Sequence, residues 1–442
     1  MSEPAARQIV DRLRAAGYQA LYAGGAVRDH LLGRPAQDYD VATDAIPEAV
    51  MRLFPHHTAV GARFGVVLVH EGEAHIEVAT FRTDATYRDG RHPEAVAYAT
   101  DPREDVQRRD FTINGLLMDP ESGAILDYVG GRADLEAGLV RAIGDPERRF
   151  AEDRLRMLRG VRFAARFGFE LEAATAAAIR RQAGEIDQVS HERIRDELLK
   201  MLTEGHARRA FELLDATGLL QAVLPEVAAM HGVEQPPQYH PEGDVWTHTM
   251  MMLGGFDALP PPRSPVLALG VLLHDVGKPP TFRRAPDRIR FDRHAAIGAR
   301  ISQAIGARLR LSATDAAQVV ALVEDHMHFP ELPHMRVSTR KRFLRRPGID
   351  DHLALHRLDC LMSHGDLSLY EYARQQLAAL QPDDVRPPRL LTGHDLIAMG
   401  YGPGPQFSEI LTAVEDAQLE GQLADAAAAR RFVGERYPMP AH

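Results

Sequence analysis

The sequence lacks the features that mark secreted, membrane-spanning or broadly basic proteins. It has one cysteine, Cys360, among 442 residues, which excludes an internal disulfide and fits a reducing cytoplasm. No uninterrupted apolar run is long enough to span a bilayer. The N-terminal stretch is charged and amphipathic, unlike a signal peptide. The net charge of −10 argues against a wholesale nucleic-acid coat but leaves room for a local basic groove. We therefore expect a cytoplasmic protein with no membrane partner.

A glycine turn near the N-terminus is the first feature that carries chemistry. Leu21–Ala23 is a short apolar strand pattern, and Gly24-Gly25 ends it and opens a helix. Backbone amides at the start of such a helix suit a phosphate group. Arg28 lies one turn later, so its guanidinium could reach the same anion. The stretch predicts a phosphate-binding turn.

Two aspartates follow this turn at a spacing that suits a metal ion. Asp38 and Asp40 are separated by one residue. If Asp38–Val41 is extended, both carboxylates point to one face of the strand. Paired carboxylates form a hard oxygen site, suited to magnesium that carries a substrate phosphate. Each motif is weak alone, and the two in this order are a much stronger signal.

GGAVRDHLLG and the later DYD resemble the signature of the class II tRNA nucleotidyltransferases and bacterial poly(A) polymerases, within the DNA polymerase beta superfamily. The resemblance implies an α/β nucleotidyltransferase head of the polymerase beta type, followed by an all-α neck, body, HD domain and tail. The expected divisions are 1–140 for the head, 141–230 for the neck and body, 240–370 for the HD domain and 385–442 for the tail. The implied reaction is template-independent addition of C, C and A, from CTP and ATP, to the 3′ end of tRNA.

Glu77 lies on the alternating strand pattern His75–Phe81, on the opposite face from Ile76 and Val78. A third carboxylate on a neighbouring strand is what a two-metal site needs for its second ion. The plainer interpretation is an exposed strand glutamate, and the resemblance favours the ligand role. The polar stretch Arg82–Thr100 resembles the flexible loop of full CCA-adding enzymes, which favours a chain that can add the terminal A.

The stretch Arg108–Asn114 reads RRDFTIN and matches a motif of the same family. The resemblance implies that Arg109 meets the phosphate or ribose of the nucleotide. Asp110 and Asn114 could bond the sugar or cap the helix that we expect to follow, and for Asp110 the cap is nearly as well supported.

Residues 141–169 show helical spacing and no strand alternation. The recurring apolar positions are Leu155, Leu158, Val161 and Ala165. The arginines that fall on one helix face are Arg156, Arg159, Arg162 and Arg166. A solvated arginine stripe is the plain interpretation. Against it, Glu152-Asp153 opens the predicted helix, and E-D-x-x-R resembles the family's nucleotide-selecting motif. The resemblance also assigns Arg159 and Arg162 to the nucleotide.

An aspartate and an arginine suit the selection of C and A without a template. Cytosine and adenine each show a ring acceptor beside an exocyclic amino donor. An arginine that donates and an aspartate that accepts satisfy both bases, which Asp153 and Arg156 could do. Uracil and guanine present a ring N–H and a carbonyl instead, and a buried mismatch costs more than a missing contact.

The second half of the chain holds a set of histidines and aspartates. His248, the adjacent pair His274-Asp275 and a later aspartate resemble the metal site of HD-domain phosphohydrolases. Both Asp359 and Asp366 are candidates for that last ligand. Imidazole with carboxylate suits a transition metal such as nickel, cobalt or manganese better than magnesium alone. The alternative is an HD fold that has lost its metal.

Two further histidines and a basic run have no role assigned by these motifs. His294 and His326 follow the HD pair on helical segments. Met335–Arg346 is the most basic run, which could contact RNA phosphates or form a solvated helix face. Val385–Pro388 is a proline break, and Gly393–Leu411 resembles the family's C-terminal segment. No protein partner is evident.

The expected cofactors and rival functions follow from these motifs. We expect magnesium at Asp38, Asp40 and Glu77, and a transition metal at the HD site. A poly(A) polymerase is one rival, although the HD domain argues against it. A partial enzyme that adds only CC or only A is another. A metal-dependent HD phosphohydrolase with a vestigial head is less consistent with the intact head motifs.

Overall fold

The computed structural model describes residues 2–36, 38–59, 64–84, 96–238, 240–286, 288–381 and 388–438. By its internal contacts the chain forms two compact units. The first comprises Met1–Ala228 with Arg308–Arg310, and the second comprises Ala229–Ala307 with Leu311–His442. Most of the predicted loop Arg82–Thr100 and most of the proline break at 385–388 lie outside the described residues.

The head of the first unit is built on a seven-stranded sheet in the order β3-β4-β5-β2-β1-β8-β9. Its strands are β1 Ala20–Ala23, β2 Asp40–Thr43, β3 His57–Thr58, β4 Val66–Glu71, β5 Ala74–Thr80, β8 Leu116–Met118 and β9 Ile125–Asp127. The central pair β2 and β5 is parallel, and the other pairs are antiparallel. A short hairpin of β6 Arg82–Asp84 and β7 Val96–Tyr98 lies apart from this sheet.

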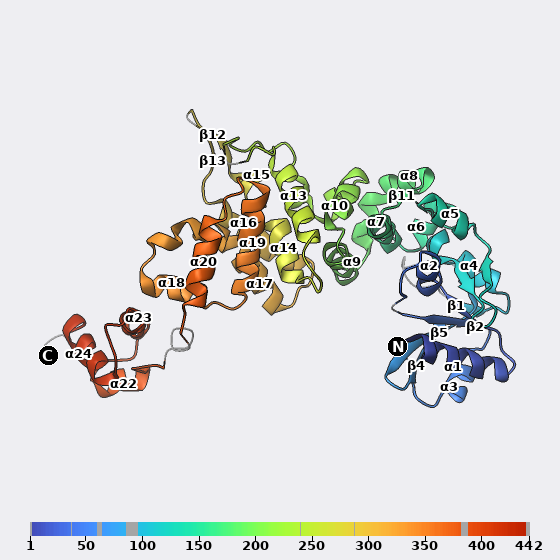
Figure 1. Cartoon of the computed structure of the whole chain (residues 1–442), viewed down its shortest axis with the longest axis horizontal. Coiled ribbons are helices and arrows are strands. Elements are labelled where there is room, and N and C mark those ends of the chain that lie inside the picture. The colour runs from blue at the N-terminus through green and yellow to red at the C-terminus, as the bar shows by residue number, and fades with distance from the viewer. Residues whose placement is uncertain are drawn as a thin grey trace. The chain divides into compact units, whose positions relative to one another are not determined.

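Amphipathic helices cover the sheet. Helix α1, Ser2–Ala15, packs on β1, β2 and β5 and buries Ile9, Val10 and Leu13. Helix α3, Pro47–Leu53, lies beside α1 in Figure 1. The connecting helices of the head are α2 Gly25–Leu31, α4 Pro102–Gln107 and α5 Gly131–Ala137, with the 3₁₀ turn η2 Thr112–Asn114. The strands β1, β2 and β5 lie where the sequence pattern predicts them.

The rest of the first unit is helical except for the short parallel pair β10 Leu139–Val140 and β11 Glu170–Leu171. Its elements are α6 Pro146–Glu152, α7 Leu155–Phe167, α8 Ala173–Gln182, η3 Ala183–Gln188, α9 His191–Thr203, α10 Ala207–Ala216, α11 Leu219–Val223 and α12 Pro225–Ala228. The predicted apolar face of α7 is buried, and α7 packs against α9 and α10.

In its described residues, the second unit is helical apart from one hairpin, β12 Phe282–Arg284 and β13 Ile289–Phe291. Its helices are α13 Val245–Asp257, α14 Pro265–Leu273, α15 Lys278–Thr281, α16 His294–Arg308, α17 Ala313–Asp325, η4 His326–His334, α18 Val337–Leu344, α19 Ile349–Met362, α20 Ser368–Ala378, α22 Gly393–Ala398, α23 Gln406–Leu419 and α24 Ala426–Arg436. Helix α14 is buried from Val266 to Leu273 among α13, α17 and α19. The α/β head followed by a helical remainder confirms the predicted fold class. None of the described helices has the length and apolarity needed to cross a membrane.

Candidate active site and metal centre

The glycine turn meets the RRDFTIN motif at Gly24. This residue begins α2 with φ of 64°, in the left-handed region that favours glycine. A Cβ atom there would lie 3.2 Å from Arg109 Nη1. Arg109 is in turn fixed by Asp105, whose buried carboxylate lies 2.9 Å from Arg109 Nη2. The structure thus brings the predicted phosphate turn and Arg109 together.

Arg28 is buried rather than directed at solvent. Its Nε donates to Asp29 Oδ1 at 2.9 Å, and its Nη1 donates to Asn114 Oδ1. The guanidinium also lies 4.6 Å from the ring centroid of Phe167, within cation–π range. Burial lowers the pKa of Arg28, and the neighbouring Asp29 opposes that shift. In this arrangement Arg28 ties α2 to the motif that carries Asn114, and its contact with a nucleotide stays a prediction.

The three predicted carboxylates gather at β2 and β5. Asp40 begins β2, one position before the cross-strand pair Val41–Val78, and Glu77 precedes Val78 on β5. Burial first, then the Glu77 and Asp38 carboxylates, raise the pKa of Asp40 to about 6, against the opposing effect of Arg109. Mutual repulsion of this kind is what a divalent cation relieves. The carboxylates therefore fit a magnesium ion by charge and donor type.

The strand pattern around Glu77 is as expected, because Ile76 and Val78 are buried and Glu77 is exposed. Asp38 lies just before β2 and is also exposed. Among the described residues, the groups of three ligand atoms that lie within 4.8 Å of one another are all in the second unit. The head carboxylates are thus neighbours that interact electrostatically, without being as tightly gathered as the histidine-rich groups described below.

Asp110 is the centre of a buried polar network and does not cap a helix. The 3₁₀ turn η2 begins after Phe111, with no side-chain cap. One Asp110 oxygen accepts from the Phe111 amide and the Asn114 side chain, and the other accepts from Arg159 Nε at 2.8 Å. Burial alone would raise the pKa of Asp110, but Arg159 and Asn114 lower it to about 2. The capping alternative is therefore wrong, and Asp110 is a fixed carboxylate that connects the head to α7.

Asp153 interrupts the predicted helix instead of opening it. Helix α6 ends at Glu152, Asp153 is extended with φ −151° and ψ 107°, and α7 begins at Leu155. Its Oδ1 accepts from the Leu155 amide at 3.1 Å. Arg193, on α9, donates to the same carboxylate from Nη1 at 3.2 Å and from Nη2 at 2.8 Å. The sequence carried no signal for this partner, which lies 40 residues away.

Arg156 is held in place by three acceptors. Its Nη1 donates to Glu152 Oε2 at 2.9 Å and to the Arg149 carbonyl, and its Nη2 donates to the Arg108 carbonyl at 3.1 Å. Such anchoring fixes the direction of a planar guanidinium. Asp153 and Arg156 stand three residues apart with separate partners, so each is oriented independently.

The remaining arginines of the stripe are paired as well. Arg162 is buried and bonds Glu197 at 2.6 Å, while Arg166 lies 3.6 Å from Glu204. Arg159 and Arg162 also flank the Phe163 ring. The stripe is therefore a set of fixed ion pairs, not the solvated face that was the plain interpretation.

The HD residues converge in the second unit. His248 comes from α13, His274 and Asp275 follow α14, and Asp359 comes from α19. His248 Nε2 lies 3.1 Å from Asp359 Oδ1, and His274 Nε2 lies 3.3 Å from Asp275 Oδ2. His248, His274 and Asp275 form one compact group of candidate metal ligands.

Asp366 does not join this group. It is exposed beyond the end of α19, and its Oδ1 accepts from the Ser368 amide at 2.8 Å. Asp359 lies within α19 on the side that faces His248. Of the two candidates for the last ligand, the structure therefore brings only Asp359 to the histidines.

The hydrogen bonding of two buried imidazole rings indicates whether the HD residues could hold a metal ion. His248 Nε2 and His274 Nε2 are buried and make no hydrogen bond among the described residues. Glu242 accepts from His248 Nδ1 at 2.6 Å, and the Val271 carbonyl accepts from His274 Nδ1 at 2.9 Å. When neutral, each ring would therefore carry its proton on Nδ1 and present the lone pair of Nε2 inward. Outer-shell bonds of this kind are typical of histidine metal ligands.

The balance of charge at the HD centre depends on whether a metal cation is bound. Burial lowers the pKa of His248, but Asp359 and Glu242 outweigh it and raise that pKa to about 9. A protonated His248 and a bound metal are therefore competing ways to balance Asp359 and Asp275. The nitrogen and oxygen donor set fits a transition-metal cation.

Two further histidines complete the centre. His294 at the start of α16 and His326 at the end of α17 form a second compact group with Asp275. Their positions on helical segments were visible in the sequence, but nothing in their spacing indicated that they meet Asp275. Only tertiary packing brings them there, because α17 packs against α14 and Gly298 of α16 lies against Val276 and Gly277, just after Asp275.

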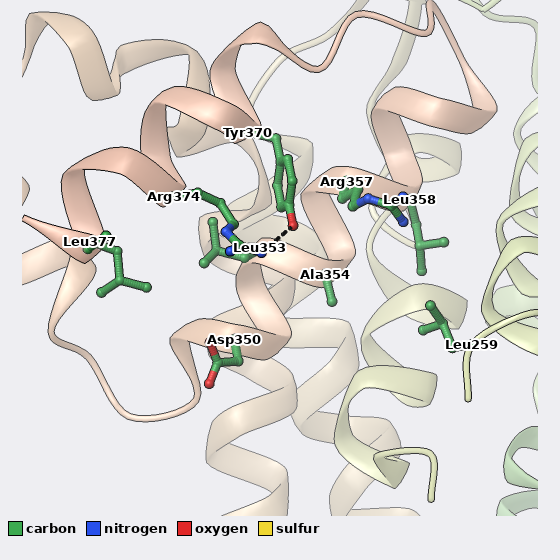
Figure 2. Close-up of a pocket in the computed structure, with 10 residues that line it drawn as sticks. Leu259, Asp350, Leu353, Ala354, Arg357, Leu358, Tyr370, Arg374 and Leu377 are labelled. Atoms are coloured by element: carbon green, nitrogen blue, oxygen red, sulfur yellow. Dashed lines mark hydrogen bonds between the residues drawn. The ribbon is translucent and has the colours of Figure 1, made fainter. Parts of the chain in front are cut away.

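A surface pocket of about 690 Å³ lies between α19 and α20, away from these ligands. Figure 2 shows Tyr370 and Arg374 on α20, with a hydrogen bond between them, and Arg357 on α19. The floor is apolar and includes Leu353 and Leu358. None of the HD ligands lines it, so it is separate from the metal centre.

The basic run 335–346 is also explained by packing. On α18, Arg342 pairs with Glu415 and Asp416, and Arg345 pairs with Glu415 of the same helix α23. Lys341 Nζ donates to the Leu419 carbonyl at 2.9 Å. The run therefore joins α18 to α23. Neither sequence-based interpretation, an RNA contact or a solvated helix face, predicted this role.

Comparison with known proteins bears on both sites. Family models match a poly A polymerase head domain over residues 20–141, a probable RNA- and SrmB-binding site of polymerase A over 168–230, and an HD domain over 244–350. The CCA-adding enzyme of Geobacillus stearothermophilus is 47% identical over 221 residues, which are 50% of this chain and 54% of that protein. The CCA-adding enzyme of Bacillus pumilus is 41% identical over 261 residues, 58% of this chain and 65% of that protein. The matches thus span 54% and 65% of the length of these two curated relatives.

The fold extends this likeness over nearly the whole chain. The crystal structure of the Bacillus stearothermophilus CCA-adding enzyme in complex with CTP has a TM-score of 0.75 and 29% identity, and the match covers 99% of this chain and 98% of that one. The Thermotoga maritima CCA-adding enzyme complexed with tRNA shares the fold at a TM-score of 0.57 and 18% identity, over 97% and 93% of the two chains. Family models, sequence relatives and fold agree in likening this chain to CCA-adding enzymes and poly(A) polymerases.

Proposed function

We propose that this chain adds C, C and A from CTP and ATP to the 3′ end of tRNA without a nucleic-acid template. The observation that carries the proposal is the grouping of Asp40 and Glu77 on adjacent strands, with Arg109 beside them at the Gly24 turn. The similar crystal structure of a CTP-bound CCA-adding enzyme supports it. We infer a cytoplasmic location from the sequence alone.

The proposed reaction is an in-line displacement at the α-phosphorus. The 3′ oxygen of the RNA forms a bond to that phosphorus, the bond to the bridging oxygen breaks, and pyrophosphate leaves while the hydroxyl proton passes to solvent. Asp38, Asp40 and Glu77 would hold magnesium, which neutralises phosphate charge and favours ionisation of the attacking hydroxyl. Arg109 would meet the nucleotide's phosphate or ribose beside the glycine turn.

Nucleotide choice would rest on two separately anchored side chains. Arg156 would donate to the ring acceptor of cytosine or adenine, and Asp153 would accept from the amino group. Arg156 takes its direction from Glu152 and two backbone carbonyls, and Asp153 takes its direction from Arg193. Fixed partners make the mismatch with uracil or guanine costly, because the two groups cannot turn away from it.

The test uses tRNA that ends before CCA, before CA and before A, with labelled CTP and ATP supplied separately and together. We expect C to be added to the first two substrates and A to the third, with complete CCA when both are present. Long A tails on unrelated RNA would identify a poly(A) polymerase instead. Addition of C to the first two substrates with no A on the third would identify a CC-only enzyme, and addition of A to the third substrate alone would identify an A-only enzyme.

We propose that the HD centre is a separate phosphohydrolase. The buried, unbonded Nε2 atoms of His248 and His274 beside Asp275 and Asp359 favour this second function. These residues would hold nickel, cobalt or manganese, which supplies an activated water for attack on a phosphate ester. A phosphomonoester or 2′,3′-cyclic phosphate on a damaged RNA end would suit an enzyme that needs a free 3′-hydroxyl.

Phosphate release from small phosphoesters, and from tRNA with a cyclic phosphate end, tests this function. Each metal is added in turn to chelator-treated protein. We expect turnover with at least one of nickel, cobalt and manganese. No turnover with any of them would leave the HD domain as a scaffold.

A further inference from the structure

The hairpin of β12 and β13 is basic, although the chain as a whole is acidic. The stretch 283–293 holds five arginines and two aspartates, in a chain whose net charge is −10. Figure 1 shows the hairpin extending away from the helices of its unit. A local concentration of arginine on an acidic protein is typical of a surface that contacts a polyanion.

One face of the hairpin combines an exposed aromatic ring with an arginine. Across the two strands, Phe282 pairs with Phe291 and Arg284 pairs with Ile289. These four side chains share a face, because side chains two positions apart along a strand point the same way. The two rings lie 6.0 Å apart between centroids, and Phe282 is 39% exposed. An open ring that stacks on a base, beside a cation that contacts a phosphate, is how proteins hold single-stranded nucleic acid.

The acidic partners of the hairpin arginines are exposed and easily exchanged. The side chains of Arg284 and Glu234 are 67% and 60% exposed, and those of Arg283 and Asp292 are 61% and 66% exposed. Ion pairs this exposed contribute little to stability, so a phosphate group can replace either carboxylate at little cost. On the other face, Arg283 lies directly across from Arg290, and a like-charge pair of this kind favours a nearby anion.

The base of the hairpin touches two residues of the HD centre. Lys278 Nζ lies 5.4 Å from the ring centroid of Phe291. His294 Nδ1 lies 3.0 Å from the Phe291 carbonyl oxygen. Lys278 in turn bonds the Asp275 carboxylate at 2.7 Å. A nucleic-acid strand that lies along the hairpin would therefore have one end at the HD centre.

We propose that the β12–β13 hairpin binds a single-stranded RNA end and directs its terminal phosphate to the HD centre. The Phe282 ring stacks on a base near the end of the strand, and Arg284 contacts a backbone phosphate. The other hairpin arginines add attraction for the strand. This inference rests on the proposed phosphohydrolase and deepens it, because it makes RNA ends, rather than small phosphomonoesters, the preferred substrate class.

A comparison of long and short substrates tests the proposal on the full, metal-loaded chain. One substrate is a short single-stranded RNA that ends in a 2′,3′-cyclic phosphate, and the other is bis-p-nitrophenyl phosphate, which is too small to reach Phe282. Phe282→Ala should raise KM for the RNA at least about fivefold, the loss expected for one stacked base. Turnover of the small ester should not show this change. Ile397→Ala on α22, another exposed apolar side chain, is the matched control and should keep the wild-type KM.

The salt dependence of the RNA reaction tests the phosphate contact. Arg284→Gln should reduce the slope of log kcat/KM against log salt concentration by about 0.7, the value for one lost phosphate contact on a single strand. Arg430→Gln on α24 removes an arginine that is 55% exposed and paired with Asp395. It is the matched control and should keep the wild-type slope.

Photocrosslinking locates the strand without any need for turnover. A 3′-phosphorylated RNA with a photoreactive thiouridine as its last base is irradiated with metal-free protein, and the crosslinked peptides are identified by mass spectrometry. We expect a crosslink within the segment 282–291, reduced at least about fivefold in Phe282→Ala and retained in Ile397→Ala. Circular dichroism checks that each variant is folded.

The hairpin surface and the phosphohydrolase fail separately in these measurements. A crosslink to the hairpin without phosphate release from any substrate would keep the RNA surface and remove the phosphohydrolase. Phosphate release from the RNA with no crosslink to the hairpin, and with KM unchanged in Phe282→Ala, would keep the phosphohydrolase and overturn the RNA surface. Equal losses on the RNA and on the small ester would also overturn it, because they would show that the hairpin only supports the HD centre.

Discussion

The surroundings of Asp40 disfavour the ionised form of its carboxyl group when no metal is bound. Burial, Glu77 and Asp38 raise its pKa to about 6, above the ordinary value of 3.8. The folded state therefore holds this proton more tightly than the unfolded state does. The resulting contribution to stability is present below about pH 4 and is lost as the pH rises through about 6. At neutral pH the ionised carboxylate is a cost that a bound cation would offset.

Asp40→Asn should therefore stabilise the metal-free protein while abolishing nucleotide addition. In EDTA the variant's melting temperature should exceed that of the wild type at pH 7.5, by an amount equivalent to about 1–3 kcal/mol. The difference should shrink towards pH 4 and in saturating magnesium. Calorimetric scans at both pH values measure it. Glu73→Gln, exposed in the β4–β5 turn, is the control and should show no such pH dependence. An Asp40→Asn variant that adds C at the normal rate would contradict the metal-site assignment.

Arg193 has no direct place in the motifs, yet it determines where the Asp153 carboxylate points. Arg193→Ala should free that carboxylate to rotate, so we expect misincorporation of UTP relative to CTP to rise at least about tenfold. One bidentate contact is worth roughly 1–3 kcal/mol of discrimination. Arg193→Lys should restore part of the selectivity, because one charged bond to Asp153 remains.

Single-turnover kinetics with each nucleoside triphosphate measures this ratio. Lys200→Ala, half-exposed on the same helix α9, is the matched control and should keep wild-type selectivity. A uniform loss of rate with CTP and UTP, and no change in their ratio, would make Arg193 a structural residue only.

At the scale of elements, the connection between α18 and α23 is ionic. Arg342 and Arg345 share Glu415, and Arg342 also pairs with Asp416. Helix α23 belongs to the small apolar cluster of α22–α24, which includes Leu396, Ile410 and Val433. Partly exposed pairs are individually weak, and several that share one carboxylate act together.

Replacing both Arg342 and Arg345 by alanine should loosen the C-terminal cluster without disturbing the HD centre. We expect faster hydrogen exchange in α22–α24, an effect that high salt reproduces in the wild type. A double-mutant cycle of Arg342 with Glu415 should give about 0.5–1 kcal/mol. Arg336→Ala, exposed at the start of α18, should leave exchange unchanged. Equal acceleration in α13 and α14 would instead indicate a general loss of stability.

The elements and the local motifs were predictable from the sequence where the signal is short in range. Periodicity placed β1, β2, β5 and the buried face of α7, and the spacing of Gly24-Gly25 and Asp38-x-Asp40 was sufficient to indicate the head. Pairings over long distances were not predictable, because periodicity says which face is buried and not what meets it. Arg193 with Asp153, and His294 with His326, depend on helix packing that no local pattern encodes.

Charged residues were the hardest to interpret. The helix break at Asp153 has no glycine or proline to announce it, and Arg28 looked like a free phosphate ligand although aromatic rings and Asn114 enclose it. The basic run on α18 could be explained only after its acidic partners on α23 were known. A charged side chain is compatible with solvent, a ligand or an ion pair, and only packing decides among them.

At the scale of the whole molecule, the two candidate sites use different carboxylates in different compact units. Asp40 and Glu77 lie in the first unit, and Asp275 and Asp359 lie in the second. The basic side chains that lower the pKa of these carboxylates belong to the same unit, since Arg109 acts on Asp40 and Lys278 acts on Asp275. Changes in one site should therefore leave the chemistry of the other intact.

Asp275→Asn should remove metal-dependent phosphate release and leave C and A addition within about twofold of wild type. The substitution keeps the size of the side chain and removes the charge that a bound cation would need, while Lys278 retains its bond to Gln235. The converse variant, Asp40→Asn, should lose addition and keep phosphate release. Both activities are assayed on the same preparations, with tRNA that ends before CCA and with a cyclic-phosphate end. A parallel loss of both in Asp275→Asn would mean that this residue holds the helical unit together, because a local charge change has no other route to a site built from separate carboxylates.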